Sequence, residues 1–544
     1  MKPLRPGRRE YRIGFLLVAL LFAAALVFPA GAVLVRAFEE GGVWTLEHWT
    51  KLLQVPDFWP MMGRSFLSAG VSALISSTLA FFAAYGLRFS TIPQRMKRAV
   101  ELMMLLPLFL PSITYGFAVI YAFGRMGLAT GLIGRLPFTI YGPAGLVFTN
   151  VLYTLPPAFL VISNAMRYAD LRWATVSRVM GDSPLRTFWA TAVRPSAGAV
   201  IAAFILAFFL AFTDFGIPIS IAGSWSVIAT ELYSAMMGAA PDFGLGAALA
   251  VVMLIPSAAA VWLLKRAEKL NYEAGVPSGE PPRPNRIRDL LITLYYALLA
   301  LFMILAFAVV FVIPFVESWP YRPEFTMRHV EGLLRDPDVW SLYGRTIAMA
   351  LLSAAFGTAV SFAAAMIRAR SELPTPCRTL MDGFAMATST LPGMVLGVGY
   401  LLAFSGTPLA NTLAVLVLCN LVHFLATPYI MATSALSKMN SGWETTGVLM
   451  GDTWFKTVRR VILPNARTTL VQMFETYFIN STVTISAIVF LTSASTEVIT
   501  TKIRELQHFE SVDRIFVLSL LIFFTNAAAK VLFDRLQKTS GENA

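Results

Sequence analysis

The chain has 544 residues, of which 57% are hydrophobic and 14% are charged. A soluble protein carries about 25% charged residues, so most of this chain is expected to lie in lipid. The formal net charge of +12 would suit nucleic acid. The basic residues gather on one side of the predicted membrane, however, and we expect no nucleic-acid partner. Cys377 and Cys419 give neither a disulfide framework nor the spacing of a metal site.

Twelve apolar runs are long enough to cross a bilayer as helices, which takes about 20 residues each. They cover residues 13–36, 64–88, 99–123, 143–166, 197–220, 243–265, 289–316, 346–368, 379–405, 409–437, 468–492 and 513–533. The first run could be a signal peptide, but it is long and lacks a good cleavage site, so we expect a retained helix. Prolines inside the runs are expected to kink helices; they are Pro107, Pro111, Pro156, Pro157, Pro392 and Pro428. The runs predict an all-α integral membrane protein with about twelve transmembrane helices.

The placement of lysine and arginine orients this protein in the membrane. With residue 1 in the cytoplasm, the cytoplasmic segments hold 31 of the 43 basic residues; these segments are 1–12, 88–98, 167–194, 265–288, 368–378, 438–467 and 530–544. Both termini are then cytoplasmic. The Pro-rich, charged stretch 267–288 is expected to be an exposed cytoplasmic linker between a first unit, 1–266, and a second unit, 289–544.

The second unit repeats the first. Gly63-Arg64-Ser65 matches Gly344-Arg345-Thr346 at a spacing of 281 residues, and from Asn150 and Asn420 onward the spacing is 270. The whole difference falls in the outward loop 124–142. Because a single register change inside a loop is what a duplication allows, we predict two tandem homologous six-helix halves with the same orientation.

The clearest repeated stretch is polar and lies between apolar runs. Residues 173–182 and 443–452 both begin with Trp and end with Met-Gly-Asp, inside cytoplasmic segments of nearly 30 residues. Apolar and basic residues alternate there, as in short amphipathic helices. Gly181 and Gly451 would permit a turn, and Asp182-Ser183 and Asp452-Thr453 would cap a second helix. One such segment would suggest a helix bound only to lipid, whereas two at matching points favour docking on a two-fold symmetric partner.

These segments resemble the cytoplasmic coupling motif of permease subunits of bacterial ATP-binding-cassette importers of the type I fold. That motif reads Glu-Ala-Ala, three residues, Gly, nine residues, Ile, any residue, Leu-Pro. Gly181 and Gly451 match its Gly and Leu463-Pro464 its end, while the motif's Glu is replaced by threonine in both copies and Glu444 lies one place away. The resemblance implies that coupling to an ATPase involves Thr175, Arg178, Gly181, Asp182, Ser183, Glu444, Thr445, Gly451, Asp452, Thr453 and Pro464.

The resemblance also implies the partners and the location. They are two copies of a cytoplasmic ATP-binding-cassette ATPase, a periplasmic or extracellular solute-binding protein and the lipid bilayer of the bacterial inner membrane, where this multi-pass chain would lie. The chain has no Gly-x-x-x-x-Gly-Lys-Ser/Thr stretch, so a separate subunit would use the ATP. We therefore expect no enzyme activity and no bound cofactor in this chain.

The solute is left open between ferric iron, a phosphonate or phosphate ester, and a small organic cation. Fused double permeases of this size resemble the ferric-iron group and its relatives for 2-aminoethylphosphonate, sugar phosphates, thiamine and polyamines. Residues 213–218 (Thr-Asp-Phe-Gly-Ile-Pro) look like a pattern of that group, and residues 478–491 look like the corresponding stretch of phosphonate and sugar-phosphate members. The alternative function is a twelve-helix secondary transporter driven by an ion gradient; a membrane scaffold or channel and an intramembrane enzyme are weaker rivals.

Polar residues inside the apolar runs are candidates for the solute pathway, because burying them in lipid is costly. The candidates are Asp214, Glu475, Asn480, Thr482 and Thr484, with Ser486 beside them. Asp214 could instead cap a helix end, and Glu475 could form a structural pair. For Asn150 and Asn420 we favour hydrogen bonds between helices. The four histidines show no metal-ligand spacing, and we expect them on loops; they are His48, His329, His423 and His508.

Overall fold

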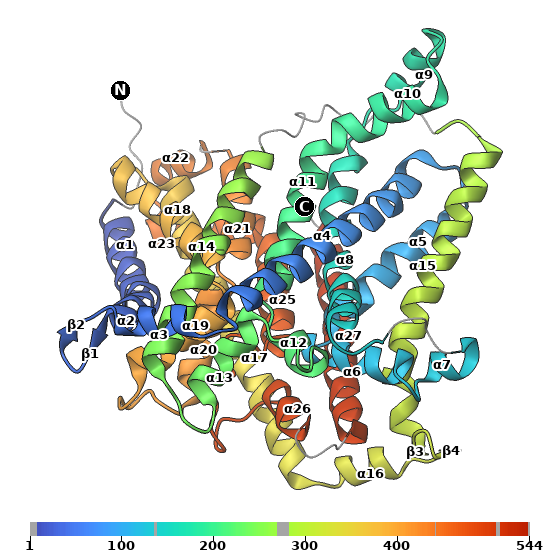
Figure 1. Cartoon of the computed structure of the whole chain (residues 1–544). Coiled ribbons are helices and arrows are strands. Elements are labelled where there is room, and N and C mark those ends of the chain that lie inside the picture. Colours follow the sequence, from blue (N-terminus) through green and yellow to red (C-terminus); the bar gives the residue numbers. More distant parts are fainter. Residues whose placement is uncertain (1–7, 135–138, 269–281, 441, 508–511, 542–544) are drawn as a thin grey trace.

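A computed structural model describes residues 8–134, 139–268, 282–440, 442–507 and 512–541. Within these ranges the chain is almost entirely helical, with two small antiparallel hairpins, β1–β2 and β3–β4 (Figure 1). The predicted all-α fold is confirmed. The central part of the expected linker, residues 269–281, lies outside the described residues; helix α14 ends at Glu268 and α15 begins at Arg286.

Most long helices of the two halves follow one another in corresponding order, although the single helix at residues 143–167 of the first half corresponds to two helices within 413–438 of the second. The first consists of α1 (Arg8–Phe22), η1 (Ala23–Val27), α2 (Phe28–Phe38), β1 (Glu39–Glu40), β2 (Val43–Trp44), α3 (Glu47–Gln54), α4 (Phe58–Phe89), α5 (Gln94–Leu105), η2 (Leu106–Phe109), α6 (Ser112–Phe123), α7 (Leu128–Ile133), α8 (Pro143–Arg167), α9 (Arg172–Val179), α10 (Pro184–Phe188), η3 (Trp189–Val193), α11 (Arg194–Thr213), α12 (Gly216–Ile221), α13 (Ile228–Met237) and α14 (Phe243–Glu268). The second consists of α15 (Arg286–Val312), η4 (Ile313–Phe315), β3 (Val316–Ser318), β4 (Arg322–Phe325), α16 (Arg328–Leu334), α17 (Pro337–Arg370), α18 (Thr375–Thr390), α19 (Gly393–Phe404), α20 (Leu413–His423), α21 (Ala426–Lys438), α22 (Gly442–Leu449), α23 (Trp454–Thr457), η5 (Val458–Ile462), α24 (Leu463–Asn465), α25 (Arg467–Val483), α26 (Ile499–Gln507) and α27 (Val512–Gly541). The repeat read from the sequence is therefore a repeat of structure.

Equivalent residues make equivalent contacts in the two halves. Ser65 of α4 accepts a hydrogen bond at 2.9 Å from the backbone N–H of Ile228, which begins α13. Its counterpart Thr346 of α17 accepts one at 3.0 Å from the N–H of Ile499, which begins α26. Each bond satisfies a free backbone donor at a helix start, where no carbonyl of the helix itself is available.

The membrane-spanning elements are less regular than the apolar runs suggest. Within the described residues, eight helices are long and apolar enough to cross a membrane, and up to eleven if three bent pairs each count as one span. The expectation of single continuous helices at 99–123, 379–405 and 409–437 is wrong, because these runs are bent by 110°, 105° and 54°. The run 468–492 is helical only as far as Val483, the last of the 17 residues of α25.

Two of the expected proline kinks are the sharpest bends. Pro111 and Pro392 stand immediately before α6 and α19, at the 110° and 105° breaks. Proline lacks an N–H and disfavours helical geometry in the residue before it, so the chain leaves the helix there. Helix α8, in contrast, continues through Pro156 and Pro157.

The first helices of the two halves are exchanged. Helix α2 packs against α19, and Tyr400 of α19 donates a hydrogen bond at 2.7 Å to the carbonyl of Ala25 in η1. Helix α15 packs against α6, and its Tyr296 donates one at 2.8 Å to the carbonyl of Ala83 in α4. A Cβ at Gly86 would lie 2.5 Å from the Tyr296 hydroxyl, so glycine permits this close approach. Each half therefore depends on a helix from the other.

Candidate coupling segments and central cavity

The two repeated polar segments lie at the same end of the molecule. Helices α9 and α10 project at the top of Figure 1, and α22 lies on the same upper side, whereas α16 and α26 lie at the bottom. This arrangement would allow one partner assembly to contact both segments. We call residues 172–188 the first hook and residues 442–457 the second hook.

Each hook is a helical hairpin whose turn is fixed by the repeated Gly-Asp pair. Gly181 and Gly451 have φ values of 80° and 79°, in the left-handed region that favours glycine. The N–H of Asp182 donates to the carbonyl of Ser177 at 3.0 Å, and that of Asp452 to the carbonyl of Gly447 at 2.9 Å. These bonds close the end of the first helix as in a Schellman motif, which explains why glycine recurs there.

The second helix of each hook begins with a hydroxyl cap. Ser183 accepts a hydrogen bond from the N–H of Arg186 at 3.3 Å, and Thr453 accepts one from the N–H of Lys456 at 3.4 Å. The preceding aspartates face basic residues further along, with Asp182 at 3.1 Å from Arg186 and Asp452 at 3.6 Å from Arg460. The aspartates therefore stabilise the hairpin, while serine and threonine provide the caps.

Large apolar side chains are exposed at the tip of each hook. Val179 and Met180 are 82% and 77% exposed, and Leu449 and Met450 are 82% and 79% exposed. Between polar segments and outside the membrane-spanning helices, such side chains favour contact with another protein. Three polar residues named from the motif lie in the helices that precede these tips: Arg178 is exposed, and Thr175 and Thr445 are half-buried. Pro464, also named from the motif, is exposed in α24, beyond the second hook.

Glu444 does not belong to the exposed surface. Its carboxylate accepts a hydrogen bond at 3.1 Å from Nε of Arg370, and the two side chains are 8% and 6% exposed. Arg370 also donates to the backbone carbonyls of Met439 and Asn440. Its carboxylate points into the protein and holds the base of the second hook, and its part in coupling to the ATPase stays a prediction.

A cavity of about 540 Å³ lies between the two halves. Helices α11 and α14 of the first half and α18, α21 and α25 of the second all line it. Of the expected pathway residues, Asp214, Asn480, Thr484 and Ser486 are in its lining. The Asp214 carboxylate also accepts the N–H of Ile217 at 2.8 Å at the start of α12. Both roles considered for Asp214, cavity lining and helix capping, therefore occur together.

Two expected pathway residues point elsewhere. Glu475 lies 2.8 Å from Nζ of Lys530 and accepts a hydrogen bond from Gln537, so it joins α25 to α27 as a structural pair. Thr482 donates at 2.8 Å to the Asn526 side chain. These partners satisfy the polar groups within the protein, as buried polar side chains require.

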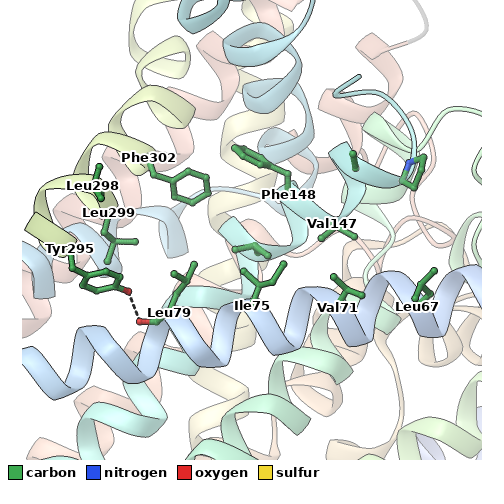
Figure 2. A pocket seen from close by; sticks show the side chains of 13 residues that line it. Leu67, Val71, Ile75, Leu79, Val147, Phe148, Tyr295, Leu298, Leu299 and Phe302 are labelled. Carbon is green, nitrogen blue, oxygen red and sulfur yellow. Dashed lines mark hydrogen bonds between the residues drawn. The ribbon is translucent and has the colours of Figure 1, made fainter. Parts of the chain in front are cut away.

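A second hollow, of about 870 Å³, is of a different kind. Figure 2 shows that it lies between α4, α8 and α15, lined by side chains such as Leu67, Ile75 and Phe302. Tyr295 supplies a hydroxyl, but it donates a hydrogen bond at 2.6 Å to the Leu79 carbonyl. None of its lining residues is charged, and Leu67 and Leu298 remain 60% and 57% exposed. This surface suits lipid chains rather than a polar solute.

The comparison with known families decides the identity of the molecule. The model of the binding-protein-dependent transport system inner membrane component family matches residues 58–269 and 373–539, which is more than half of the chain and includes both hooks. The chain belongs to this family. It is thus the permease subunit of an ATP-binding-cassette importer, a multi-pass membrane protein made of two fused copies of the family unit.

The permease is similar over most of its length to curated transport proteins. It is 22% identical to a putative ferric transport system permease protein of Haemophilus influenzae, over 89% of this chain and 78% of that one. It is also 22% identical to the ferric transport system permease protein of Actinobacillus pleuropneumoniae, over 90% of this chain and 73% of that one. The thiamine transport system permease protein of Escherichia coli is 22% identical over 66% of this chain and 67% of its own.

Two residues of the permease cavity were missed by sequence reasoning. His423, expected on a loop, ends α20 and lines the cavity, and Tyr153 lines it from the equivalent place in α8. The available signal was that His423 falls inside a predicted membrane run, where a polar side chain suggests a function. The loop expectation is also wrong for His48 in α3 and His329 in α16, and His508 lies outside the described residues.

The repeated asparagines are buried, and the side-chain amide of Asn420 does not form the expected hydrogen bond between helices. Asn150 and Asn420 are 1% and 0% exposed. Among the described residues of the permease, neither amide atom of Asn420 has a partner, nor does Oδ1 of Asn150. The preference for interhelical bonding at Asn420 is therefore wrong for this conformation. Buried amides of this kind normally find a partner or a water.

Proposed function

We propose that this permease carries ferric iron across the bacterial inner membrane, driven by two copies of a cytoplasmic ATPase. One ATPase copy would bind each hook. A periplasmic solute-binding protein would deliver the iron at the end of the permease opposite the hooks. Neither ATP chemistry nor a bound cofactor is assigned to this chain. Nucleotide-driven approach of the two ATPase copies would draw the hooks together and open the cavity alternately to each side.

The observation that carries the coupling part is the pair of matched apolar tips on one end of the molecule. Met180 and Met450 are 77% and 79% exposed at the same place in two hairpins of the same geometry. Two exposed tips related by a pseudo-two-fold axis suit a partner that is itself two-fold symmetric. A transporter driven by an ion gradient has no use for such a pair, so the secondary-transporter alternative is not favoured.

The ferric part of the proposal has two supports. The relatives similar over nine-tenths of this chain are named for ferric transport. The cavity lining includes one carboxylate, Asp214, and one cationic side chain, Lys265. Recognition of a phosphate or phosphonate commonly uses arginine, which forms bidentate bonds with such groups, and no arginine is among the described lining residues. No relative named above is a phosphonate permease.

The test is reconstituted transport. The full permease would be purified in mild detergent, where we expect an ATPase to accompany it in a ratio of about two to one. The complex would then be placed in vesicles with binding protein loaded with radioactive ferric iron. We expect uptake with ATP and none with a proton gradient alone. Uptake driven by the gradient without ATP would contradict the coupling part, and ATP-driven uptake of another solute in place of iron would contradict the ferric part.

A further inference from the structure

The polar groups of the central cavity differ between its two walls. At the repeat spacing of 270, Tyr153 corresponds to His423, Asp214 to Thr484 and Leu210 to Asn480, and all six line the cavity. The first half thus contributes a carboxylate and a phenol. The second contributes an imidazole, an amide and a hydroxyl. The duplication has produced a site with complementary ligands from two walls rather than two identical sites.

The imidazole of His423 packs closely against a glycine that is replaced by serine in the first half. Its ring lies against Gly393, where an added Cβ would be 3.1 Å from Cε1 and 3.2 Å from Nε2. The residue equivalent to Gly393 in the first half is Ser112, whose hydroxyl instead bonds to Asp214. His423 Nδ1 is buried and has no hydrogen-bond partner among the described residues. An imidazole nitrogen left unpaired in this way is costly unless another group uses it.

Hydrogen bonds hold the Asp214 carboxylate in place, but no ion pair with another described residue neutralises its charge. The N–H of Ile217 and the hydroxyl of Ser112 orient its carboxylate. No ion pair involves it within the described part of the chain, and the one lysine of the lining, Lys265, lies in the last turn of α14. A carboxylate held in a mostly apolar cavity attracts a passing cation far more strongly than one in water.

We propose that Asp214 and His423, assisted by Asn480 and Thr484, form a transit site for a metal cation inside the cavity. The proposal rests on the proposed ferric function and names the residues that would handle the ion. The described residues contain no group of three or more His, Cys, Asp or Glu side chains able to hold a metal. Two strong ligands and neutral helpers suit passage, because a conducting site must bind weakly enough to release its ion.

The test uses the full permease with its ATPase in vesicles and binding protein loaded with radioactive ferric iron. Asp214→Asn and His423→Gln keep the approximate shape and remove the carboxylate charge or the imidazole nitrogens. We expect each to lower iron uptake about tenfold, or ~1.4 kcal/mol. ATPase stimulation by the loaded binding protein should stay unchanged, because the hooks and the outer surface are intact.

Two threonines of the same segment provide the matched control. Thr484 lines the cavity, whereas Thr482 bonds to Asn526 away from it. Thr484→Val should lower iron uptake severalfold, and Thr482→Val should leave uptake per folded molecule at the wild-type level. Folding of every variant is checked by its yield as a single species in size-exclusion chromatography.

The outcomes separate the two proposals. Normal iron uptake by Asp214→Asn and His423→Gln would overturn the transit site while leaving the ferric function standing. Uptake that falls equally in the Thr482 and Thr484 variants would also overturn it, because the loss would then be structural. If the wild-type complex carries an anion and no iron, the ferric function fails and the cation site fails with it.

Discussion

The two hooks have nearly the same tips but different supports. In the second hook, the buried Arg370–Glu444 pair holds the base, and Trp454 packs edge-on against Tyr11 of α1 at 5.4 Å between ring centroids. In the first hook, Phe188 packs edge-on against Tyr85 of α4 at 5.2 Å between ring centroids, and just before the hook the carbonyl of Ala169 accepts a hydrogen bond from Arg88 at 2.7 Å. The second hook is therefore supported by a buried ion pair and by the N-terminal helix, whereas the first is supported by aromatic packing on α4 and by this hydrogen bond.

The comparison separates the tips of the hooks, which match, from their supports, which differ. The φ angles at the two glycines differ by one degree, and the exposed tips match in chemistry, although the contacts that join the hooks to the rest of the protein differ. A constraint that acts on the tip but not on the base is expected if a partner touches only the tip. The buried charge pair also explains how the second hook keeps a glutamate near the motif position without presenting it to a partner.

The largest effect is expected from charging a tip. Met180→Asp and Met450→Asp would each place a charge in an apolar contact, at a cost of several kcal/mol if it is buried there. We expect each variant to lose ATP-driven uptake by more than about tenfold and to retain less ATPase on purification. Met126, exposed by 60% in the segment between α6 and α7, provides the control. Normal transport by Met180→Asp alone would show that the two hooks are not equivalent.

The next prediction compares the strength of the interactions that support the two hooks. Arg370→Met leaves Glu444 buried without its partner, and breaking such a pair costs about 3–5 kcal/mol. Arg88→Met removes bonds to a carbonyl that water can reach, and should cost about 1 kcal/mol. Hydrogen exchange should therefore accelerate strongly in α22 for the first variant and weakly in α9 for the second. The double variant Arg370→Met with Glu444→Leu should recover most of the loss; a double variant as unstable as the single one would contradict the ion-pair explanation.

A smaller loss of stability, equal in the two hooks, is expected when the glycines of the two turns are substituted. Gly181→Ala and Gly451→Ala meet no neighbouring atom, so their cost is that of a left-handed backbone, about 1 kcal/mol each. The controls are the equivalent helical glycines Gly63 and Gly344, which also have open space and where alanine should stabilise. Thermal unfolding of the four variants checks the prediction. Unequal losses at Gly181 and Gly451 would mean that the supports, rather than the turns, set the stability of the hooks.

Sequence reasoning succeeded where one local pattern determines one structure. The Gly-Asp-Ser and Gly-Asp-Thr turns, the duplication and the presence of bends at Pro111 and Pro392 could be predicted, because the backbone conformation there depends on a few adjacent residues. The exchange of the first helices could not be predicted. The apolar surface of α2 or α15 would fit either half, and only packing details such as Gly86 against Tyr296 decide between them.

The site was predicted in part for the same reason. Asp214, Asn480 and Thr484 were found because polar residues in apolar runs are rare. The burial of Glu444 against Arg370 could not be predicted, because Arg370 lies 74 residues earlier in the chain. His423 was missed because a lone histidine has no spacing to interpret. Its importance emerges only when Tyr153, its counterpart in the repeat, is found in the lining of the same cavity.

The smallest expected effect compares the ends of the two halves that lie away from the hooks, and it depends on pH. Burial, together with a hydrogen bond to Glu505, raises the pKa of Glu497 to about 7 from its ordinary value of 4.5. The folded state therefore holds a proton that the unfolded chain releases at lower pH. The resulting stability is present below about pH 4.5 and is lost as the pH rises through about 7. At the equivalent place the first half has Ser226, which does not titrate in this range and bonds to Asp57.

Hydrogen exchange, corrected for the intrinsic effect of pH, should accordingly show α26 less protected at pH 8 than at pH 6. Helix α13 should show no such change. Glu497→Gln keeps a hydrogen-bonding side chain without the titration, so it should abolish the pH dependence in α26 alone. The effect is small because Lys502, at 3.5 Å from Glu497, opposes it and because the group is partly solvated. If hydrogen exchange in α13 and α26 changes with pH to the same extent, the titrating group is not Glu497. The regions around α13 and α26 would then be more similar than their side chains indicate.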